Sequence, residues 1–341
     1  MKISVISTTI NIPKVIEVYQ GLTDEVSVII TGDKKSPDIE IASFCAQFEN
    51  VTYLDVASQV AMNTKSSELM GWNCIQRRNI ALLAALKQRP DLIVTIDDDN
   101  FPCGVDYFDH FERILGRPFT GLAARTHGEA MDIGQFFEPP FHHRGFPYDL
   151  RESPAELRLS PVNNVKIGVA AGLWLGDPDI DAATRLVNGP VVKDLTEVVR
   201  QGVVSTPDTL CVFNSQNTGW ESELAPLMMV WPGVGRYDDI WASYAAQRVM
   251  REDGWHVHFG HPLVWQQRNP QNLISNIKAE IFGMETTPRL LNDMEAIDVR
   301  GSTIPDRMAS LWAGLGQLNY LPEQTRKAGV AWCEDVYQVL S

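Results

Sequence analysis

The sequence has few of the features that mark secreted, membrane-spanning or nucleic-acid-binding proteins. Its five cysteines are odd in number, scattered and free of any CxxC pair, so we expect reduced thiols and not a disulfide framework. No apolar run reaches the length of about 18 residues that a membrane span needs. The opening MKISVISTTINIP is too short and too polar for a secretory signal. We therefore expect a cytoplasmic protein.

Basic residues are also scarce. The chain of 341 residues has 29 Lys and Arg against 43 Asp and Glu, which gives a formal net charge of −14. This excess of negative charge argues against nucleic acid as a partner. With 44% apolar and 21% charged residues, the composition is that of a globular enzyme, long enough for one large domain or two ordinary ones.

The stretch Leu92–Pro102, LIVTIDDDNFP, carries the strongest chemical signal. Leu92–Ile96 is a continuous apolar run, which predicts a strand buried on both faces. Asp97, Asp98 and Asp99 follow at once, at the edge where open α/β sheets bind ligands. Three adjacent carboxylates repel one another, and no Lys or Arg adjoins them in sequence. The pattern therefore favours a divalent cation, Mn²⁺ or Mg²⁺, that grips a diphosphate; the alternative is an acidic, solvated turn.

The region before this stretch alternates strands and helices. Strands are expected at Lys2–Ser7, Val26–Thr31 and Val51–Val56, and the alternation continues to about residue 125, which predicts an α/β fold with a mostly parallel sheet. Thr8 begins the polar turn after the first strand, and Asp33 follows the second. Both are candidates for substrate binding, Asp33 through the base or ribose of a nucleotide. A plain strand-ending turn is the alternative for Asp33.

A helix is predicted at Cys74–Leu86, with an apolar face that leads into the aspartate strand. Arg77, Arg78 and Asn79 lie in its first turns, close to the expected ligand edge of the sheet. They are candidates for phosphate or ribose contact. The alternative is that the arginines are solvated and that Asn79 is satisfied locally.

The composition changes from Thr126 onwards. The loop Phe136–Arg151 is rich in Pro, Gly, His, Arg and aromatic residues, which is typical of a functional loop. Further strands are expected at Val165–Leu175 and Thr209–Asn214. The glycine-bearing segment Pro232–Asp239 leads into another amphipathic helix.

Asp238 and Asp239 stand at the start of that helix. Carboxylates there cap the free amide groups of the first turn, and we expect one of the two to do only that. The other is a candidate catalytic residue that hydrogen-bonds sugar hydroxyls or moves protons.

Four motifs occur in a fixed order: the IDDD end of the aspartate strand, RGFPYDLRE at Arg144–Glu152, GLWLGDPDIDAATRLV at Gly172–Val187, and GRYDDIWA at Gly235–Ala242. Together they resemble the reversibly glycosylated polypeptide family, the UDP-arabinopyranose mutases, over roughly residues 90 to 285. The N-terminal third resembles that family only as a nucleotide-sugar-binding half-domain of the GT-A type.

This resemblance implies a GT-A fold, a nucleoside-diphosphate sugar such as a UDP-sugar as substrate, and a divalent metal at Asp97–Asp99. It implies that Arg144, in the RGFP motif, becomes reversibly glycosylated, and that Arg151 is a second functional arginine. Trp174 of the LWL motif and Asp97 join the candidates for substrate binding. Asp149 and Glu152 are candidates to orient or deprotonate Arg144, and Arg151 to hold the diphosphate.

Two domains are expected. Residues 1–285 would form the GT-A nucleotide-sugar-binding and catalytic domain, and residues 286–341 a helical C-terminal extension. The extension is predicted from three amphipathic stretches, near Pro288–Ile297, Pro305–Leu318 and Pro322–Leu340.

The chain departs from the family pattern in two places. The segment Ser153–Val165 lengthens the link to the LWL motif. The family carries a histidine after its last strand, where this chain reads WQQRNP at Trp265–Pro270. If that histidine is a metal ligand, Gln266 or Gln267 replaces it or the metal site is weaker.

Three functions remain open. The first is a nucleotide-sugar mutase that interconverts pyranose and furanose forms and glycosylates itself. The second is a metal-dependent glycosyltransferase with a separate acceptor, for which Phe136–Arg151 would form part of the acceptor site. The third is a non-catalytic nucleotide-sugar-binding subunit of a homo- or hetero-oligomer.

Overall fold

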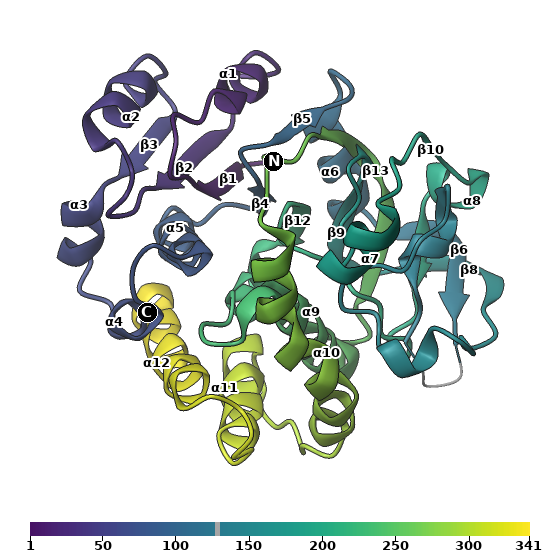
Figure 1. The fold of residues 1–341 in the computed structure, drawn as a ribbon. Coiled ribbons are helices and arrows are strands. Elements are labelled where there is room, and N and C mark those ends of the chain that lie inside the picture. Colours follow the sequence, from purple (N-terminus) through teal and green to yellow (C-terminus); the bar gives the residue numbers. More distant parts are fainter. Residues whose placement is uncertain (127–129) are drawn as a thin grey trace.

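The computed structural model describes residues 1–126 and 130–341. Within these residues eleven strands form one sheet (Figure 1). They are β1 (Ile3–Thr8), β2 (Ser27–Thr31), β3 (Val51–Leu54), β4 (Leu92–Ile96), β5 (Asn100–Pro102), β6 (Phe119–Arg125), β8 (Arg158–Val165), β9 (Ile167–Gly176), β11 (Val203–Ser205), β12 (Asn217–Glu221) and β13 (His256–Gln266). Two short strands, β7 (Phe137–Glu138) and β10 (Asp194–Leu195), pair with each other apart from it.

Helices cover the sheet and make up the C-terminal part of the chain. The α-helices are α1 (Val15–Gln20), α2 (Asp38–Cys45), α3 (Val56–Ala61), α4 (Lys65–Met70), α5 (Arg78–Lys87), α6 (Tyr107–Leu115), α7 (Ala182–Asn188), α8 (Glu197–Arg200), α9 (Asp238–Met250), α10 (Leu273–Glu295), α11 (Ile304–Leu315) and α12 (Glu323–Leu340). The 3₁₀ helices are η1 (Ile75–Arg77), η2 (Ile133–Phe136), η3 (Tyr148–Leu150), η4 (Ser222–Met228), η5 (Gly235–Tyr237) and η6 (Arg251–Asp253). In the described part of the chain, every helix is too short or too polar to cross a bilayer.

The strand order is β3-β2-β1-β4-β12-β9-β13-β11-β6-β8, with β5 paired to the end of β13. The first four strands in this order pair in parallel, as their alternation with helices predicts. β9 and β13 are also parallel, as are β6 and β11. Strand β12 runs antiparallel between β4 and β9. The structure confirms the predicted α/β fold class, with a mostly parallel central sheet and a helical C-terminal part.

This strand order collects polar residues at one edge of the sheet. Strands β4, β9 and β13 all end at that edge, and the antiparallel β12 begins there. The Asp97 amide donates to Gln216 O over 3.1 Å, and the Asp177 amide donates to Gln266 O over 3.0 Å. Residues that follow three strands and precede a fourth are therefore neighbours, although they lie far apart in the sequence.

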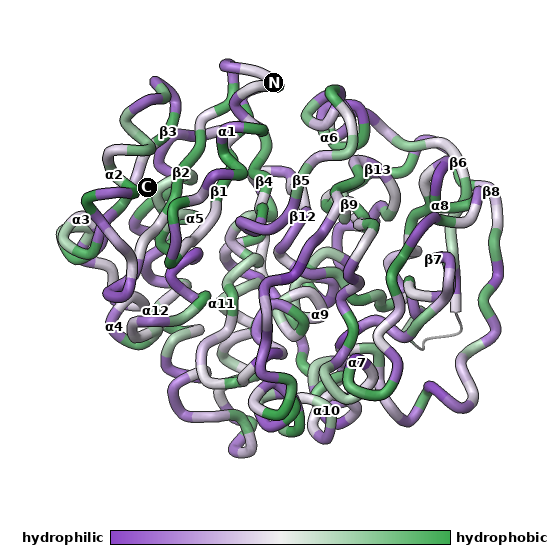
Figure 2. Tube along the Cα trace, turned by 45° about the horizontal axis from the view of Figure 1, so that its top comes forward, coloured by the Kyte–Doolittle hydropathy of each residue, from purple (hydrophilic) through white to green (hydrophobic). Residues whose placement is uncertain are grey.

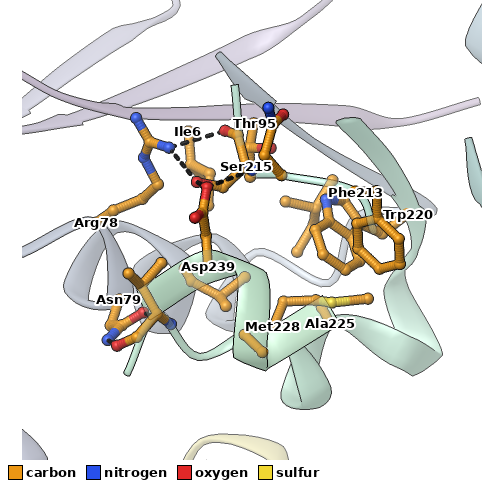
Figure 3. A pocket seen from close by; sticks show the side chains of 15 residues that line it. Ile6, Arg78, Asn79, Thr95, Phe213, Ser215, Trp220, Ala225, Met228 and Asp239 are labelled. Carbon is orange, nitrogen blue, oxygen red and sulfur yellow. Dashed lines mark hydrogen bonds between the residues drawn. The ribbon is translucent and has the colours of Figure 1, made fainter. Parts of the chain in front are cut away.

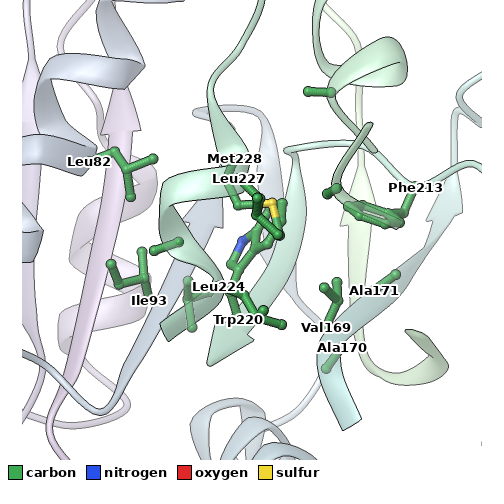
Figure 4. Close-up of a cluster of buried hydrophobic side chains, with 14 of the residues drawn as sticks. Leu82, Ile93, Val169, Ala170, Ala171, Phe213, Trp220, Leu224, Leu227 and Met228 are labelled. Atoms are coloured by element: carbon green, nitrogen blue, oxygen red, sulfur yellow. The ribbon is translucent and has the colours of Figure 1, made fainter. Parts of the chain in front are cut away.

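The core between the sheet and its helices is apolar. Leu82 on α5, Ile93 on β4 and Trp220 on β12 point toward one another, together with residues of η4 (Figure 4). In Figure 2 hydrophobic residues mark the interior strands, β2 and β9 among them. Burial on both faces explains why Leu92–Ile96 reads as an uninterrupted apolar run, and the strand predicted there is confirmed residue for residue.

The C-terminal helices pack onto the sheet-bearing part of the chain and are not a separate appendage. Helix α12 lies beside α4 and α5 (Figure 1). On α12, Asp335 accepts the backbone amides of Lys65 and Ser66 over 2.8 Å each, which satisfies free donors at the start of α4. Helix α10 begins at Leu273, fifteen residues before the predicted Pro288, so the boundary drawn between residues 285 and 286 falls inside this helix.

The strand predicted at Thr209–Asn214 is wrong. This segment is mostly buried, but within the described residues it pairs only through an isolated bridge between Cys211 and Met131. The side chain of Gln247 on α9 bonds both the amide and the carbonyl of Cys211, over 3.0 and 2.8 Å. The strand in this region is β12, which begins three residues later at Asn217. The extra segment Ser153–Val165 supplies β8, the outermost strand of the sheet.

Candidate active site

A cavity of about 430 Å³ opens at the edge of the sheet where these polar residues meet. Its walls come from the start of α5, the ends of β4 and β13, the turn before β12, the RGFP loop, and the start of α9. The charged and amide side chains that line it are Gln76, Arg78, Asp97, Asp99, Arg144, Gln216, Arg236, Asp238, Asp239, Gln266, Arg268 and Gln271. Carboxylates and guanidinium groups thus face the same space.

The three aspartates after β4 have different surroundings. Asp97 forms an ion pair with Arg78, and Asp98 accepts a hydrogen bond from Thr9 Oγ1 over 3.0 Å. Asp99 Oδ1 is buried and has no hydrogen-bond partner among the described residues. Burial, together with the charges of Asp97 and Asp98, raises the pKa of Asp99 to about 7. Asp99 is therefore the carboxylate of the three that most needs a cation.

No Lys or Arg adjoins Asp97–Asp99 in the sequence, but basic side chains do approach these aspartates in the folded chain. In space Arg78 contacts Asp97, and the charge of Arg268 acts on Asp99. Among the described residues, no group of three or more His, Cys, Asp and Glu side chains converges on one point as a closed metal site. Asp97 and Asp99 present to the cavity carboxylate oxygens of the kind that a hard divalent cation takes as ligands.

The two glutamines considered as replacements for the family histidine behave differently. Gln266 is buried and lines the cavity, but its Oε1 accepts a hydrogen bond from Gln216 Nε2 over 3.0 Å. Gln267 is exposed. Arg268 is the residue of this segment that brings charge into the cavity, and its Nε is buried without a hydrogen-bond partner among the described residues. A guanidinium suits the anionic part of a substrate.

Arg78 connects the aspartates to the rest of the cavity. Its Nη1 donates to Ser215 O over 2.8 Å and to Ser215 Oγ over 2.7 Å. Ser215 in turn donates to Asp239 Oδ2 through its amide, over 3.0 Å, and its hydroxyl lies 3.2 Å from the same oxygen (Figure 3). Behind these groups lies a mostly apolar pocket of about 20 Å³, room for about one water molecule.

Arg144 lies against the cavity in a buried ion-pair network. Its Nε donates to Asp179 Oδ1 over 2.8 Å and its Nη2 to Asp179 Oδ2 over 3.0 Å. Nη2 also lies 3.4 Å from Asp239 Oδ1, and Nη1 donates to Arg236 O. Burial alone would lower the pKa of Arg144, but Asp179 and Asp239 raise it well above its ordinary value. The resting guanidinium is therefore charged.

Asp179 is the centre of this network. Besides Arg144 it accepts from Asn214 Nδ2 over 2.7 Å and from Arg268 Nη2 over 3.3 Å. Burial would raise the pKa of Asp179, but Arg144 and Arg268 hold it well below its ordinary value. The predicted partners of Arg144, Asp149 and Glu152, do not contact it. They are exposed, and Asp149 lines a different cavity.

The close approach of the RGFP loop to α9 requires glycine. Gly145 has φ +92°, a conformation that L side chains rarely adopt, and a Cβ there would lie 2.2 Å from Ile240 Cγ2. Tyr244 donates its hydroxyl to Gly145 O over 3.1 Å. The loop is thereby fixed to the helix that carries Asp238 and Asp239.

The two aspartates at the start of α9 differ. Asp239 bonds Arg144 and Ser215, as described above. Asp238 accepts from Gln76 Nε2 over 2.9 Å and from the Asp239 amide over 3.0 Å, so it is the one that satisfies a first-turn amide. Burial and the charge of Asp239 raise the pKa of Asp238 to about 7.

Arg77 and Asn79 lie inside the fold and not on the cavity. Arg77 donates to Gln59 Oε1 over 2.8 Å and stacks 3.9 Å from the ring centre of Trp72. Asn79 bonds both the carbonyl and the amide of Val230, over 2.9 and 2.8 Å. The contacts of Asn79 agree with the alternative that it is satisfied locally. Arg77 is neither solvated nor on the cavity, because its side chain is fully buried, whereas Arg78 does reach the cavity.

Thr8 and Asp33 lie at the ends of β1 and β2. Thr8 donates its hydroxyl to Thr31 O over 3.0 Å. Asp33 is buried and accepts the amides of Lys34 and Cys74, over 2.7 and 2.9 Å, and Cys74 lines the cavity. These contacts shape the wall next to the aspartates.

Arg151 and Trp174 are near the RGFP loop but do not line the cavity. Arg151 Nη1 donates to Asp181 Oδ2 over 3.0 Å, and its guanidinium lies 3.6 Å from the ring centre of Tyr148. Trp174 is buried against Phe137, with ring centres 5.4 Å apart.

Sequence reasoning missed Asp179, which holds Arg144, and several residues that line the cavity: Gln76, Ser215, Gln216, Arg236, Arg268 and Gln271. Asp179 had a weak signal, because its GDPD segment follows a predicted strand. Ser215 and Gln216 precede β12, the strand that was placed too early, so their position at the ligand edge was hidden.

Comparison with known proteins identifies relatives. The protein-family model described as reversibly glycosylated polypeptide matches residues 2–306. UDP-arabinopyranose mutase 3 of Arabidopsis thaliana is 32% identical over 206 residues, 56% of this chain and 51% of its own length. Probable UDP-arabinopyranose mutase 1 of Zea mays is 30% identical over 206 residues, 56% and 51% of the two chains. The chain thus spans about half the length of the curated relatives that it matches.

Two solved structures are more distantly similar. One is the mannosyltransferase PcManGT from Pyrobaculum calidifontis in complex with GDP-Man and Mn²⁺, with a TM-score of 0.38 and 12% identity over 99% of this chain and 87% of that one. The other is a mycobacterial protein, with a TM-score of 0.39 and 13% identity over 84% and 73% of the two chains. Likenesses this weak have no bearing on the chemistry of the cavity.

Proposed function

Because the chain belongs to the reversibly glycosylated polypeptide family, we propose that it is a nucleotide-sugar mutase. It interconverts the pyranose and furanose forms of a UDP-sugar, UDP-arabinose or a close relative, and carries the sugar on Arg144 between the two. The observation that supports this most directly is the position of Arg144: buried, held by Asp179, and facing the cavity that Asp97 and Asp99 also line.

The diphosphate binds between the aspartates and the arginines. Asp97 and Asp99 would hold Mn²⁺ or Mg²⁺, and the bound cation would supply positive charge that stabilises the leaving diphosphate. Arg78 and Arg268 contact the phosphate oxygens. The buried Nε atoms of both arginines and Asp99 Oδ1 have no hydrogen-bond partner among the described residues, and this pattern suits an anion and a cation that arrive together.

Transfer of the sugar to Arg144 requires a proton acceptor, because a charged guanidinium is a poor nucleophile. Arg144 Nη2 loses a proton to Asp239, 3.4 Å away. The lone pair on Nη2 then bonds the anomeric carbon, while the bond from that carbon to the diphosphate oxygen breaks and the diphosphate leaves with the electron pair. Asp179 remains the anionic clamp, since its pKa lies well below the ordinary value.

To test this function, the purified chain is incubated with labelled UDP-arabinopyranose and a divalent cation, without an acceptor. The proposal expects UDP-arabinofuranose by chromatography and one added pentose by intact-mass spectrometry. Release of free arabinose and UDP without furanose would point instead to a glycosyltransferase that lacks its acceptor. Binding without any conversion would point to a non-catalytic nucleotide-sugar-binding subunit.

A further inference from the structure

Four carboxylates of the described residues line the cavity, and Asp238 differs from Asp97 and Asp239 in having no arginine partner; Asp99, the fourth, lies beside Asp97 and is assigned to the cation. Asp97 pairs with Arg78, and Asp239 contacts Arg144. Within the described residues, Asp238 has no ion pair: its carboxylate accepts one hydrogen bond from Gln76 Nε2 over 2.9 Å and one from the Asp239 amide over 3.0 Å. Only 8% of the residue is exposed.

This setting favours a carboxyl group that changes its protonation state near neutral pH. Burial and the neighbouring charge of Asp239 raise the pKa of Asp238 to about 7, against the opposing charges of Arg144 and Arg236. Among the described residues, Asp239, Arg144 and Arg236 are the charged groups with the largest effect on Asp238, and Gln76 adds a neutral amide donor. Two adjacent carboxyl groups in different environments are the usual arrangement for separate acid–base roles.

A ring contraction needs such a group. After transfer to Arg144, the sugar is a pyranose with its anomeric carbon bonded to a guanidine nitrogen. Opening the ring leaves the ring oxygen in need of a proton, and closing it through another hydroxyl releases a proton. Asp239 holds the proton of Arg144 from the preceding step and must return it when the sugar goes back to the diphosphate, so the proton that the ring oxygen needs is assigned to a second carboxyl group.

We propose that Asp238 is the residue that donates and then recovers this proton. The inference rests on the proposed function. The lone pair of the linked Arg144 nitrogen forms a C1=N bond as the C1–O5 bond breaks, and O5 takes the proton of Asp238. The O4 oxygen then attacks C1, its proton returns to the Asp238 carboxylate, and the C=N electron pair returns to nitrogen. Nothing is oxidised or reduced, and no water is consumed.

Gln76 is the positioning residue for this step. Its Nε2 donates to Asp238 Oδ2 and lies 3.3 Å from Trp231 O, so the amide is held in place from two sides. Donation to the carboxylate stabilises the charged form of Asp238. Replacement of Gln76 by leucine removes that donor, and the proton should then remain on Asp238 to a higher pH.

The test separates sugar transfer from ring contraction. Asp238→Asn is compared with Asp239→Asn and wild type for the pentose adduct by intact mass and for UDP-arabinofuranose by chromatography. We expect Asp238→Asn to keep the adduct while furanose formation falls about 100-fold or more. Asp239→Asn should lose the adduct. Furanose formation at the wild-type rate in Asp238→Asn overturns the inference, and so does loss of its adduct while UDP binding is retained.

A second variant covers the case in which Asp238→Asn folds poorly. In Gln76→Leu, the fall in turnover on the alkaline side of the pH profile should move to higher pH by about one unit, with the adduct unchanged. An unshifted profile overturns the inference. If wild type forms neither adduct nor furanose, the proposed function itself fails, which is a distinct result.

Discussion

Arg144 and Asp179 form a two-pronged ion pair inside the protein, with Nε–Oδ1 and Nη2–Oδ2 distances of 2.8 and 3.0 Å. The two residues are 35 positions apart in the sequence. Their pairing means that the arginine proposed to carry the sugar is already oriented and charged before the substrate binds.

Replacement of Asp179 should therefore harm the fold as well as the chemistry. Removal of one partner of a buried pair leaves the other charge uncompensated, which costs about 3–5 kcal/mol. We expect Asp179→Asn to lower the free energy of unfolding by about that amount in urea titrations. The Arg144→Leu/Asp179→Leu double variant should be less destabilised than the sum of the single variants; strictly additive losses would contradict the coupling.

The sugar adduct should depend on Arg144 itself. Intact-mass spectrometry after incubation with UDP-arabinopyranose should show one added pentose on wild type and none on Arg144→Ala. Arg185→Ala is a matched control, because Arg185 lies nearby, 3.6 Å from Asp177, but does not line the cavity. An adduct that persists in Arg144→Ala, or that maps to another residue, would remove Arg144 from the mechanism.

Asp99 should be required for metal-dependent binding. Its unpartnered Oδ1 faces the repulsion of two neighbouring aspartates, so a cation is expected to bind there together with the diphosphate. By titration calorimetry, Asp99→Asn should weaken UDP binding in Mn²⁺ at least tenfold, with little change in melting temperature. Asp109→Asn on the exposed side of α6 should bind like wild type. Full activity of wild type in excess chelator would refute this role.

The free energy of unfolding should depend on pH through Asp238. The unfolded chain releases this proton near the ordinary pKa of 3.8, whereas the folded chain keeps it to about 7. The folded state binds more protons between these values, so its stability falls as the pH rises through them. At about pH 8, Asp238→Asn should be more stable than wild type by about 4 kcal/mol, the value of a shift of about three pKa units. The difference should shrink toward pH 5, and a pH-independent difference would count against the raised pKa.

Substitutions of Asn79 and Arg78, which are adjacent in the sequence, should have different effects, one on stability and the other on UDP binding. Asn79 satisfies both main-chain groups of Val230, so Asn79→Ala leaves buried groups unpaired and should cost about 1–3 kcal/mol. Its affinity for UDP, measured below the melting transition, should be close to that of wild type. Arg78→Ala should weaken UDP binding instead, and equal effects of the two variants on affinity would contradict this assignment.

The sequence by itself was enough to predict those features that depend on a few consecutive residues. The apolar run of β4 and the three aspartates after it were readable, because burial on both faces and the polar edge of a sheet leave a pattern within a few consecutive residues. The same holds for the RGFP motif and for most of the alternating strands and helices.

Which charged side chains contact one another could be decided only from the tertiary structure. Arg78 bonds Ser215 across 137 positions, and Arg144 is held by Asp179 and not by the nearby Asp149 or Glu152. These contacts depend on β12 running antiparallel between β4 and β9, a strand order that is not encoded in any short segment. The raised pKa of Asp238 likewise comes from burial and from the charge of Asp239 in the folded chain, since the same dipeptide exposed to water would titrate near its ordinary value.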